Sequence, residues 1–258
     1  MTIQAKETAA LRSLLARSAQ IAPGRIESYG PDPEQLIEWF GEDVSGPTPL
    51  VLVHGGYFRP STDRSHARFA AAELGRELAR PVALVEYRRV SGHPDASTAD
   101  LCTVSDLLEG IYGGSAAWVG HSAGGTLVLH RAFDQVRPPV PTVALAPIVD
   151  LRRGLRDRLG DGAIEAWLGA RTAAKPSRYA HLDPSRMLTE VPERLPYVVA
   201  LHGQADATVP VSQSGESRIA HRLLAGAHHY DLIDPESPAW AEVVQCIRHQ
   251  VAAGAADL

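Results

Sequence analysis

The chain has 258 residues and a mass of 27.7 kDa, enough to bury one sizeable core. Its net charge of −5 argues against nucleic acid as the main partner, because phosphate binding needs a clustered basic surface. The two cysteines, Cys102 and Cys246, suit neither a metal cluster nor a disulfide framework, which favours a reducing compartment. No apolar run reaches the length of a signal or membrane segment, so we expect a cytoplasmic protein without a membrane partner.

Apolar periodicity along the chain predicts an α/β fold. The first 45 residues predict a helix and two antiparallel strands, 25–30 and 35–41, at the edge of a sheet. Strands with their following turns are expected at 49–56, 81–89, 116–125, 141–151 and 195–206. Helices are expected at 65–80, 98–114, 125–133 and 235–254, the second with Asp100 near its start.

This alternation of strands and helices predicts a mostly parallel sheet with helices on both faces. The sequence contains no internal repeat that would indicate a second unit. We therefore expect a single domain over residues 1–258, with a short helical cap near residues 151–187.

The most specific motif is "GHSAG", residues 120–124, which has the pattern G-x-S-x-G. A strand is expected before it and a helix after it, which is the context that a strained nucleophile turn requires. Such a turn lifts the Ser122 hydroxyl above the end of the strand, beside the positive end of the next helix. A glycine–serine turn that arose by chance would not need a strand before it and a helix after it. Ser122 is therefore the candidate nucleophile.

A serine hydroxyl is a weak nucleophile unless a base and an orienting acid accompany it. Asp206 follows the strand in "VVALHGQAD", and "AGAHHYDLID" offers His228 and His229, of which at most one is the base. In folds with such a serine turn between a parallel strand and a helix, the three residues follow one another along the chain in the order Ser, Asp, His. Asp206 and His229 are only 23 positions apart, which is short for a full helix plus strand, so one element must be compressed.

The stretch "VHGGYFR" places two glycines and two aromatics directly after a buried strand. By itself this loop fits a phosphate cradle, a simple turn or another anion site. A phosphate loop would carry more glycines and a Lys-Ser/Thr ending. Beside Ser122, the backbone amides of Gly56 or Tyr57, together with that of Ala123, become the candidate oxyanion hole.

Taken together, these motifs resemble the α/β-hydrolase superfamily and, within it, the arylformamidase (kynurenine formamidase)-like esterases. The resemblance rests on "HGGYFR", "VEYRR", "GHSAGG", "RYAHLDPS", "HGQADATVP" and "HHYDLID", which span roughly residues 50–235. It implies that Ser122 is the nucleophile, Asp206 the acid and His229 the base, because His229 directly precedes the aromatic–acid pair. Members of this branch commonly have Trp where the chain has Phe58.

The resemblance implies hydrolysis of an aryl formamide such as N-formylkynurenine, or of a small ester, through an acyl-enzyme. Tyr57 and Phe58 are expected to bind substrate and to narrow the acyl side. A general carboxylesterase or thioesterase stays open, as does a binding protein or cyclase on the same fold.

The expected partner is a small-molecule substrate; a homodimer stays open. The histidines have no metal-ligand spacing, so neither a metal nor a cofactor is expected. Tyr87 and Arg88 follow a strand end near the site, and a structural role is favoured for both.

Overall fold

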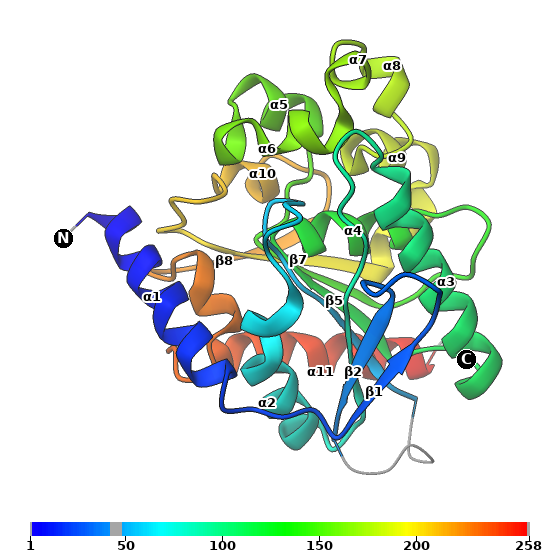
Figure 1. The fold of residues 1–258 in the computed structure, drawn as a ribbon, viewed down its shortest axis with the longest axis vertical. Helices are drawn as coiled ribbons and strands as arrows, with labels where there is room; N and C mark the ends of the chain where they lie inside the picture. The colour runs from blue at the N-terminus through cyan, green and yellow to red at the C-terminus, as the bar shows by residue number, and fades with distance from the viewer. Residues whose placement is uncertain (1, 42–47, 257–258) are drawn as a thin grey trace.

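A computed structural model describes residues 2–41 and 48–256 (Figure 1). Its strands are β1 (Arg25–Ser28), β2 (Leu36–Phe40), β3 (Leu50–Val53), β4 (Val82–Val85), β5 (Ala117–His121), β6 (Thr142–Leu145), β7 (Val198–Gly203) and β8 (Ala220–Leu224). Its longer helices are α1 (Ile3–Ser18), α2 (Arg68–Leu78), α3 (Asp95–Tyr112), α4 (Ala123–Ala132), α6 (Leu159–Leu168) and α11 (Trp240–Ala256).

Shorter helices connect these elements. They are α5 (Leu151–Arg156), α7 (Ala170–Ala173), α8 (Pro176–Tyr179), α9 (Pro184–Glu190), α10 (Ser212–Gly215) and the 3₁₀ helices η1 (Arg64–Ala67), η2 (Pro192–Tyr197) and η3 (His229–Ile233). Within the described residues, no helix is both long enough and apolar enough to cross a membrane.

The eight strands form one sheet in the order β1-β2-β4-β3-β5-β6-β7-β8. Strands β3 to β8 pair in parallel, and β2 pairs antiparallel with both β1 and β4. The expected α/β fold is confirmed, including the antiparallel strands at one edge. Parallel strands all end at the same edge of the sheet, so the loops after β3, β5 and β7 meet there.

Two hydrophobic cores cover the two faces of the sheet, as the short continuous apolar strands require. Along β3, Val51 and Val53 belong to the core beneath α3 and α4. The alternate residues Leu50 and Leu52 belong to the core beneath α1, α2 and α11. Successive side chains of a strand point to opposite faces, so this alternation follows from strand geometry.

Helix α3 begins earlier than the sequence suggested. It starts at Asp95, so the expectation that Asp100 lies near its start is wrong. Asp100 is instead a buried carboxylate that binds the Arg88 guanidinium at 2.6 Å and the Gln35 amide at 2.7 Å. A buried carboxylate needs such partners, and the contact with Arg88 connects α3 to the loop after β4.

The helices α5 to α9 lie within residues 151–190, which include the segment expected as a cap, 151–187. Figure 1 shows α5 to α8 gathered at one end of the molecule, away from α2 and α11. This segment contacts the loop after β3, because the Arg59 guanidinium donates to the Gly160 carbonyl at 2.6 Å. Between Asp206 and His229, the helix is the compressed element: α10 has four residues.

Candidate active site

Ser122 lies in a sharp turn between β5 and α4, and its backbone has φ 56° and ψ −119°. This conformation is sparsely populated by residues with a side chain, and it is the strained turn that G-x-S-x-G predicts. The two glycines allow the close approach. A Cβ on Gly120 would lie 2.3 Å from the Gly124 carbonyl oxygen, and one on Gly124 would lie 2.2 Å from that of Val53.

The structure brings His229 and Asp206 together. Nδ1 of His229 lies 2.7 Å from Oδ2 of Asp206, and both side chains are buried. A carboxylate only accepts hydrogen bonds, so Nδ1 carries the proton and Nε2 keeps a free lone pair. Ser122 and His229 line the same cavity. Nucleophilic catalysis by a serine requires such an arrangement, in which a carboxylate orients a histidine at the cavity of the serine.

Asp206 is held in its ionised form by its surroundings. Its Oδ1 accepts hydrogen bonds from the amides of Thr208 at 2.8 Å and Val209 at 2.7 Å. Burial alone would raise the pKa of Asp206, but the His229 imidazole and the hydrogen bonds from His202 and His229 lower it well below its usual value. Asp206 is therefore a carboxylate across the neutral pH range.

His228 points away from this pair. Its backbone amide donates to the Asp231 carboxylate at 2.7 Å, and its Nδ1 lies 3.3 Å from the same oxygen. His228 is thus the residue before η3, where it caps the turn. Of the two adjacent histidines, His229 is the one that faces Asp206.

The loop after β3 passes directly over Ser122. A Cβ on Gly55 would lie 2.9 Å from the Cβ of Ser122, so only glycine fits there without displacement. Gly56 and Tyr57 line a cavity of about 140 Å³ together with Ser122 and His229. Ala123 is the first residue of α4, where backbone amides lack an intrahelical acceptor. Of the predicted oxyanion donors, Gly56 and Tyr57 thus line the cavity of Ser122, and Ala123 directly follows Ser122 in the chain.

The two aromatics of this loop have different surroundings. Tyr57 lines the Ser122 cavity, and its hydroxyl donates to the Thr208 carbonyl in the Asp206 loop. Phe58 is buried against Trp167 of α6 and lines a separate hollow of about 160 Å³. The structure thus places Tyr57, but not Phe58, at the cavity of Ser122.

A buried ionic network supports the loop from behind. His54, the residue before the glycines, contacts Glu86 through Nε2 at 3.0 Å, and Arg89 forms an ion pair with the same carboxylate. The Tyr87 hydroxyl donates to the His54 carbonyl at 3.1 Å. Arg88 binds Asp100 instead. Tyr87 and Arg88 therefore have structural contacts.

Further residues of the site were not expected from the sequence. His121, between the glycine and the serine of the motif, donates from Nε2 to the His229 carbonyl at 3.0 Å. Burial and the neighbouring His229 lower the pKa of His121 well below its usual value, so it is neutral. Leu11 and Arg59 also line the cavity, and Glu7 contacts the loops of the catalytic pair. Glu7 and Leu11 lie in α1, far from any motif.

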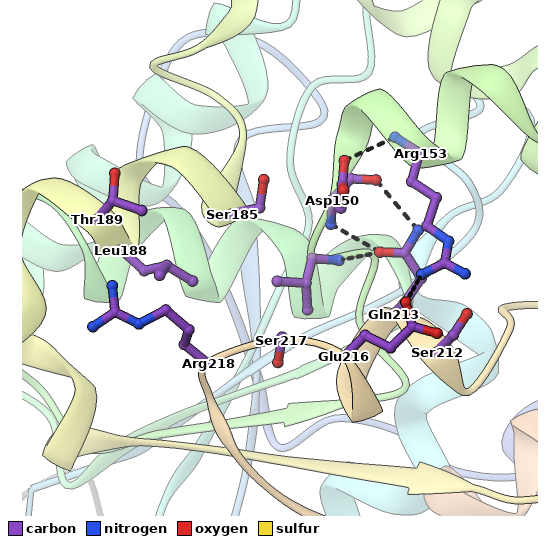
Figure 2. Close-up of a pocket in the computed structure, with 11 residues that line it drawn as sticks. Asp150, Arg153, Ser185, Leu188, Thr189, Ser212, Gln213, Glu216, Ser217 and Arg218 are labelled. Carbon is purple, nitrogen blue, oxygen red and sulfur yellow. Dashed lines mark hydrogen bonds and ion pairs between the residues drawn. The ribbon is translucent and has the colours of Figure 1, made fainter.

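A third hollow, of about 200 Å³, is lined by a different set of residues between α5, α9 and α10 (Figure 2). Its polar groups bind one another: Gln213 Oε1 accepts from the amides of Val149 and Asp150, and Arg153 pairs with Glu216 at 2.6 Å. These contacts stabilise the local chain path. In residues 2–41 and 48–256, no three His, Cys, Asp or Glu side chains are arranged to hold a metal ion.

Comparisons with known proteins bear on the fold and the family. Among solved structures, the fold is similar to a putative thioesterase from a Silicibacter species, with 23% identity, TM-score 0.67 and coverage of 93% of this chain and 92% of that chain. Esterase B from Lactobacillus rhamnosis has 17% identity and TM-score 0.70, with 99% and 96% covered. A bacterial heroin esterase has 21% identity and TM-score 0.68, with 96% and 90% covered.

At these identities the solved structures show a shared fold. A search of the curated proteins gives no match to the sequence. Residues 50–256 match the sequence pattern of a family described as the alpha/beta hydrolase family. Because this match covers most of the chain, the protein belongs to the alpha/beta hydrolase family.

Proposed function

We propose that this hydrolase cleaves a small acyl group from an aryl formamide of the N-formylkynurenine type by a Ser-His-Asp mechanism. His229 Nε2 takes the proton of the Ser122 hydroxyl while Oγ of Ser122 attacks the acyl carbon. The imidazolium then gives that proton to the leaving nitrogen, and the C–N bond breaks. A water molecule, deprotonated by His229, hydrolyses the acyl-enzyme and restores Ser122. The contact between His229 and Asp206 at 2.7 Å supports these roles.

The oxyanion of the tetrahedral intermediate is bound by the backbone amides of Gly56, Tyr57 and Ala123. This role is supported by Gly56 and Tyr57 lining the Ser122 cavity and by Ala123 following Ser122 in the chain. Tyr57 is held by its hydroxyl contact with the Thr208 carbonyl, which ties the oxyanion loop to the loop of Asp206.

The small size of the cavity is the observation that favours a small acyl group. At about 140 Å³, it is well below the roughly 300–1,000 Å³ of ordinary ligand sites. A formyl group, or another short acyl group, fits such a volume beside Ser122. The rest of the substrate extends towards the rim, where the exposed Arg59 supplies a cation. N-formylkynurenine carries an α-carboxylate, which suits that cation.

A short-chain carboxylesterase or thioesterase is the second candidate. It is favoured by the printed names of the similar structures, which are esterases and a thioesterase. The same three residues would act, and only the leaving group would differ. A binding protein or cyclase on this fold is less well supported, because the nucleophile, base and acid types lie together in one cavity or in direct contact with it.

The test is a comparison of hydrolysis of N-formylkynurenine with a series of p-nitrophenyl esters from acetate to octanoate. We expect the formamide to have the highest kcat/KM and the ester rates to fall with chain length. A fluorophosphonate probe should label the protein and leave the Ser122→Ala variant unlabelled. A higher kcat/KM for the acetate ester than for the formamide would favour the esterase. Failure of the probe to label the protein would remove the hydrolytic mechanism.

A further inference from the structure

Glu7 is an unusual residue for a surface helix, because its side chain is completely buried. Its carboxylate accepts three hydrogen bonds from the two loops that carry the catalytic pair. Oε1 accepts from the amides of Ala207 at 2.8 Å and His229 at 3.1 Å. Oε2 accepts from the Thr208 hydroxyl at 2.7 Å. One side chain thus connects the residue after Asp206 to His229 itself.

The His229 backbone is held from both sides by these contacts. Its N–H donates to Glu7, and its carbonyl accepts from His121 Nε2 at 3.0 Å. The ring is fixed separately, through Nδ1 and Asp206. His229, the base of the proposed mechanism, is therefore held by three hydrogen bonds. Glu7 accepts the one from its backbone N–H.

Helix α1 is fixed on the molecule by contacts other than those of Glu7. Leu14 is fully buried, Arg17 pairs with Asp234 at 2.6 Å, and the Ser18 hydroxyl donates to the His66 carbonyl at 3.1 Å. Figure 1 shows α1, in blue, alongside the orange segment that contains η3. The Glu7 carboxylate is therefore held in place by an anchored helix, whose anchors include Asp234 at the end of η3.

We propose that Glu7 is a positioning residue of the active site: from the N-terminal helix, it fixes the distance between the Asp206 loop and the His229 backbone. This inference rests on the proposed Ser-His-Asp mechanism. It adds a residue that lies outside residues 50–256, the segment that matches the family. Burying a carboxylate is costly unless it is hydrogen-bonded, so the two loops and Glu7 stabilise one another in this single arrangement.

Two conservative variants separate position from charge. Glu7→Gln keeps the length: its amide oxygen can accept from both backbone N–H groups, and its NH₂ can donate to the Thr208 hydroxyl, which also accepts. Glu7→Asp keeps the charge, but its side chain is one methylene shorter and cannot reach both loops. Glu7→Ala removes both. Leu14→Ala is the matched control, because it weakens the docking of α1 and leaves the three Glu7 hydrogen bonds in place.

The rate is measured as kcat per Ser122 labelled by a fluorophosphonate probe, so misfolded protein does not count. We expect Gln to stay within about threefold of the wild type, Asp to lose about tenfold, and Ala to lose about a hundredfold, with little change in KM. Leu14→Ala should lower Tm and leave the rate per site within about threefold. Rates of Asp and Ala variants near that of the wild type would overturn the proposal, and so would equal losses in all four variants.

A second readout does not depend on turnover. The proton shared by His229 and Asp206 gives a downfield NMR signal, which should persist in Glu7→Gln and in Leu14→Ala and broaden or vanish in Glu7→Asp. If the wild type shows this signal but hydrolyses nothing, the proposed function fails, and the NMR series alone decides the role of Glu7. An unchanged signal in Glu7→Asp would then overturn it.

Discussion

The ring of Phe58 stacks on the indole of Trp167, with centroids 4.0 Å apart and planes inclined by 9°. This pair joins the loop after β3 to α6, which lies in the segment expected as a cap. Phe58→Ala should therefore lower the free energy of unfolding by about 3–5 kcal/mol, measured by denaturant titration. The acyl-chain preference should be unchanged, because Phe58 does not line the Ser122 cavity in the described residues. Tyr57→Ala is the contrast, and it should accept longer acyl chains.

The link between His229 and Asp206 predicts a large loss from a small change. Asp206→Asn removes the charge and allows His229 to adopt the wrong tautomer. We expect kcat to fall by about 10³–10⁴-fold with little change in KM. Steady-state kinetics and denaturation of the same preparation check this result. A loss below tenfold, with stability unchanged, would show that Asp206 does not orient the base.

The close passage of Gly55 over Ser122 predicts that even one methyl group disturbs the nucleophile. Gly55→Ala would place a Cβ 2.9 Å from that of Ser122 and 3.0 Å from the His121 carbonyl oxygen. We expect kcat to fall by at least about a hundredfold, the typical effect of losing one oxyanion donor. Gly110→Ala is the control, because nothing lies within 4 Å of its added Cβ and alanine favours the helix. That variant should have wild-type kcat.

The exposed Arg59 at the cavity rim predicts a substrate-dependent effect. Arg59→Ala should raise KM for N-formylkynurenine about tenfold, because a charge-assisted contact with its carboxylate is lost. KM for p-nitrophenyl acetate, which has no carboxylate, should stay within twofold of the wild type. Arg59→Lys keeps the charge and should give an intermediate KM. Equal effects on both substrates would mean that Arg59 does not read the carboxylate.

Buried His66 predicts how stability depends on pH. Burial and the neighbouring His54 lower its pKa to about 4, whereas in the unfolded chain its pKa is about 6.5. Between these values the unfolded state binds more protons, so the free energy of unfolding falls as the pH drops from 6.5 to 4. The full loss from His66 is about 3 kcal/mol.

Denaturant titrations at several pH values measure this loss. His66→Asn keeps a donor for the Asp63 carbonyl, which His66 Nδ1 contacts at 2.9 Å. Its stability should therefore vary less between pH 6.5 and 4 than that of the wild type. Parallel curves for the two proteins would contradict the assignment.

The nucleophile turn, the α/β fold and the Asp206–His229 pair follow from sequence patterns for a local reason. The sharp turn at Ser122 requires glycines two residues away on each side, and a buried parallel strand requires a continuous apolar run. Parallel strands then bring Asp206 and His229 to the edge where Ser122 lies, although 84 residues separate Ser122 from Asp206. The order Ser, Asp, His was therefore enough to predict that these residue types meet at one edge, but not which of His228 and His229 faces Asp206.

The position of Asp100 shows where local patterns failed. Helical periodicity identified α3, but the first turn was assigned from an acidic residue, which often lies near a helix start. The helix begins at Asp95, five positions before Asp100, and Asp100 is instead a buried partner of Arg88 within the helix. Only the packing of α3 against the loop after β4 distinguishes these two roles.

The amino-acid sequence was sufficient to predict the class of fold, the strained turn at Ser122 and the acid and base types available to it. Those features depend on backbone conformation, which neighbouring residues encode. The packing of distant segments decided that Phe58 packs on Trp167 and that Glu7 binds His229, 222 positions away in the chain. It also set His229 rather than His228 against Asp206, a choice that the residues left open and that the resemblance favoured. Side-chain contacts of this kind depend on how distant segments pack, because a buried polar group can bind any donor that the fold brings within reach.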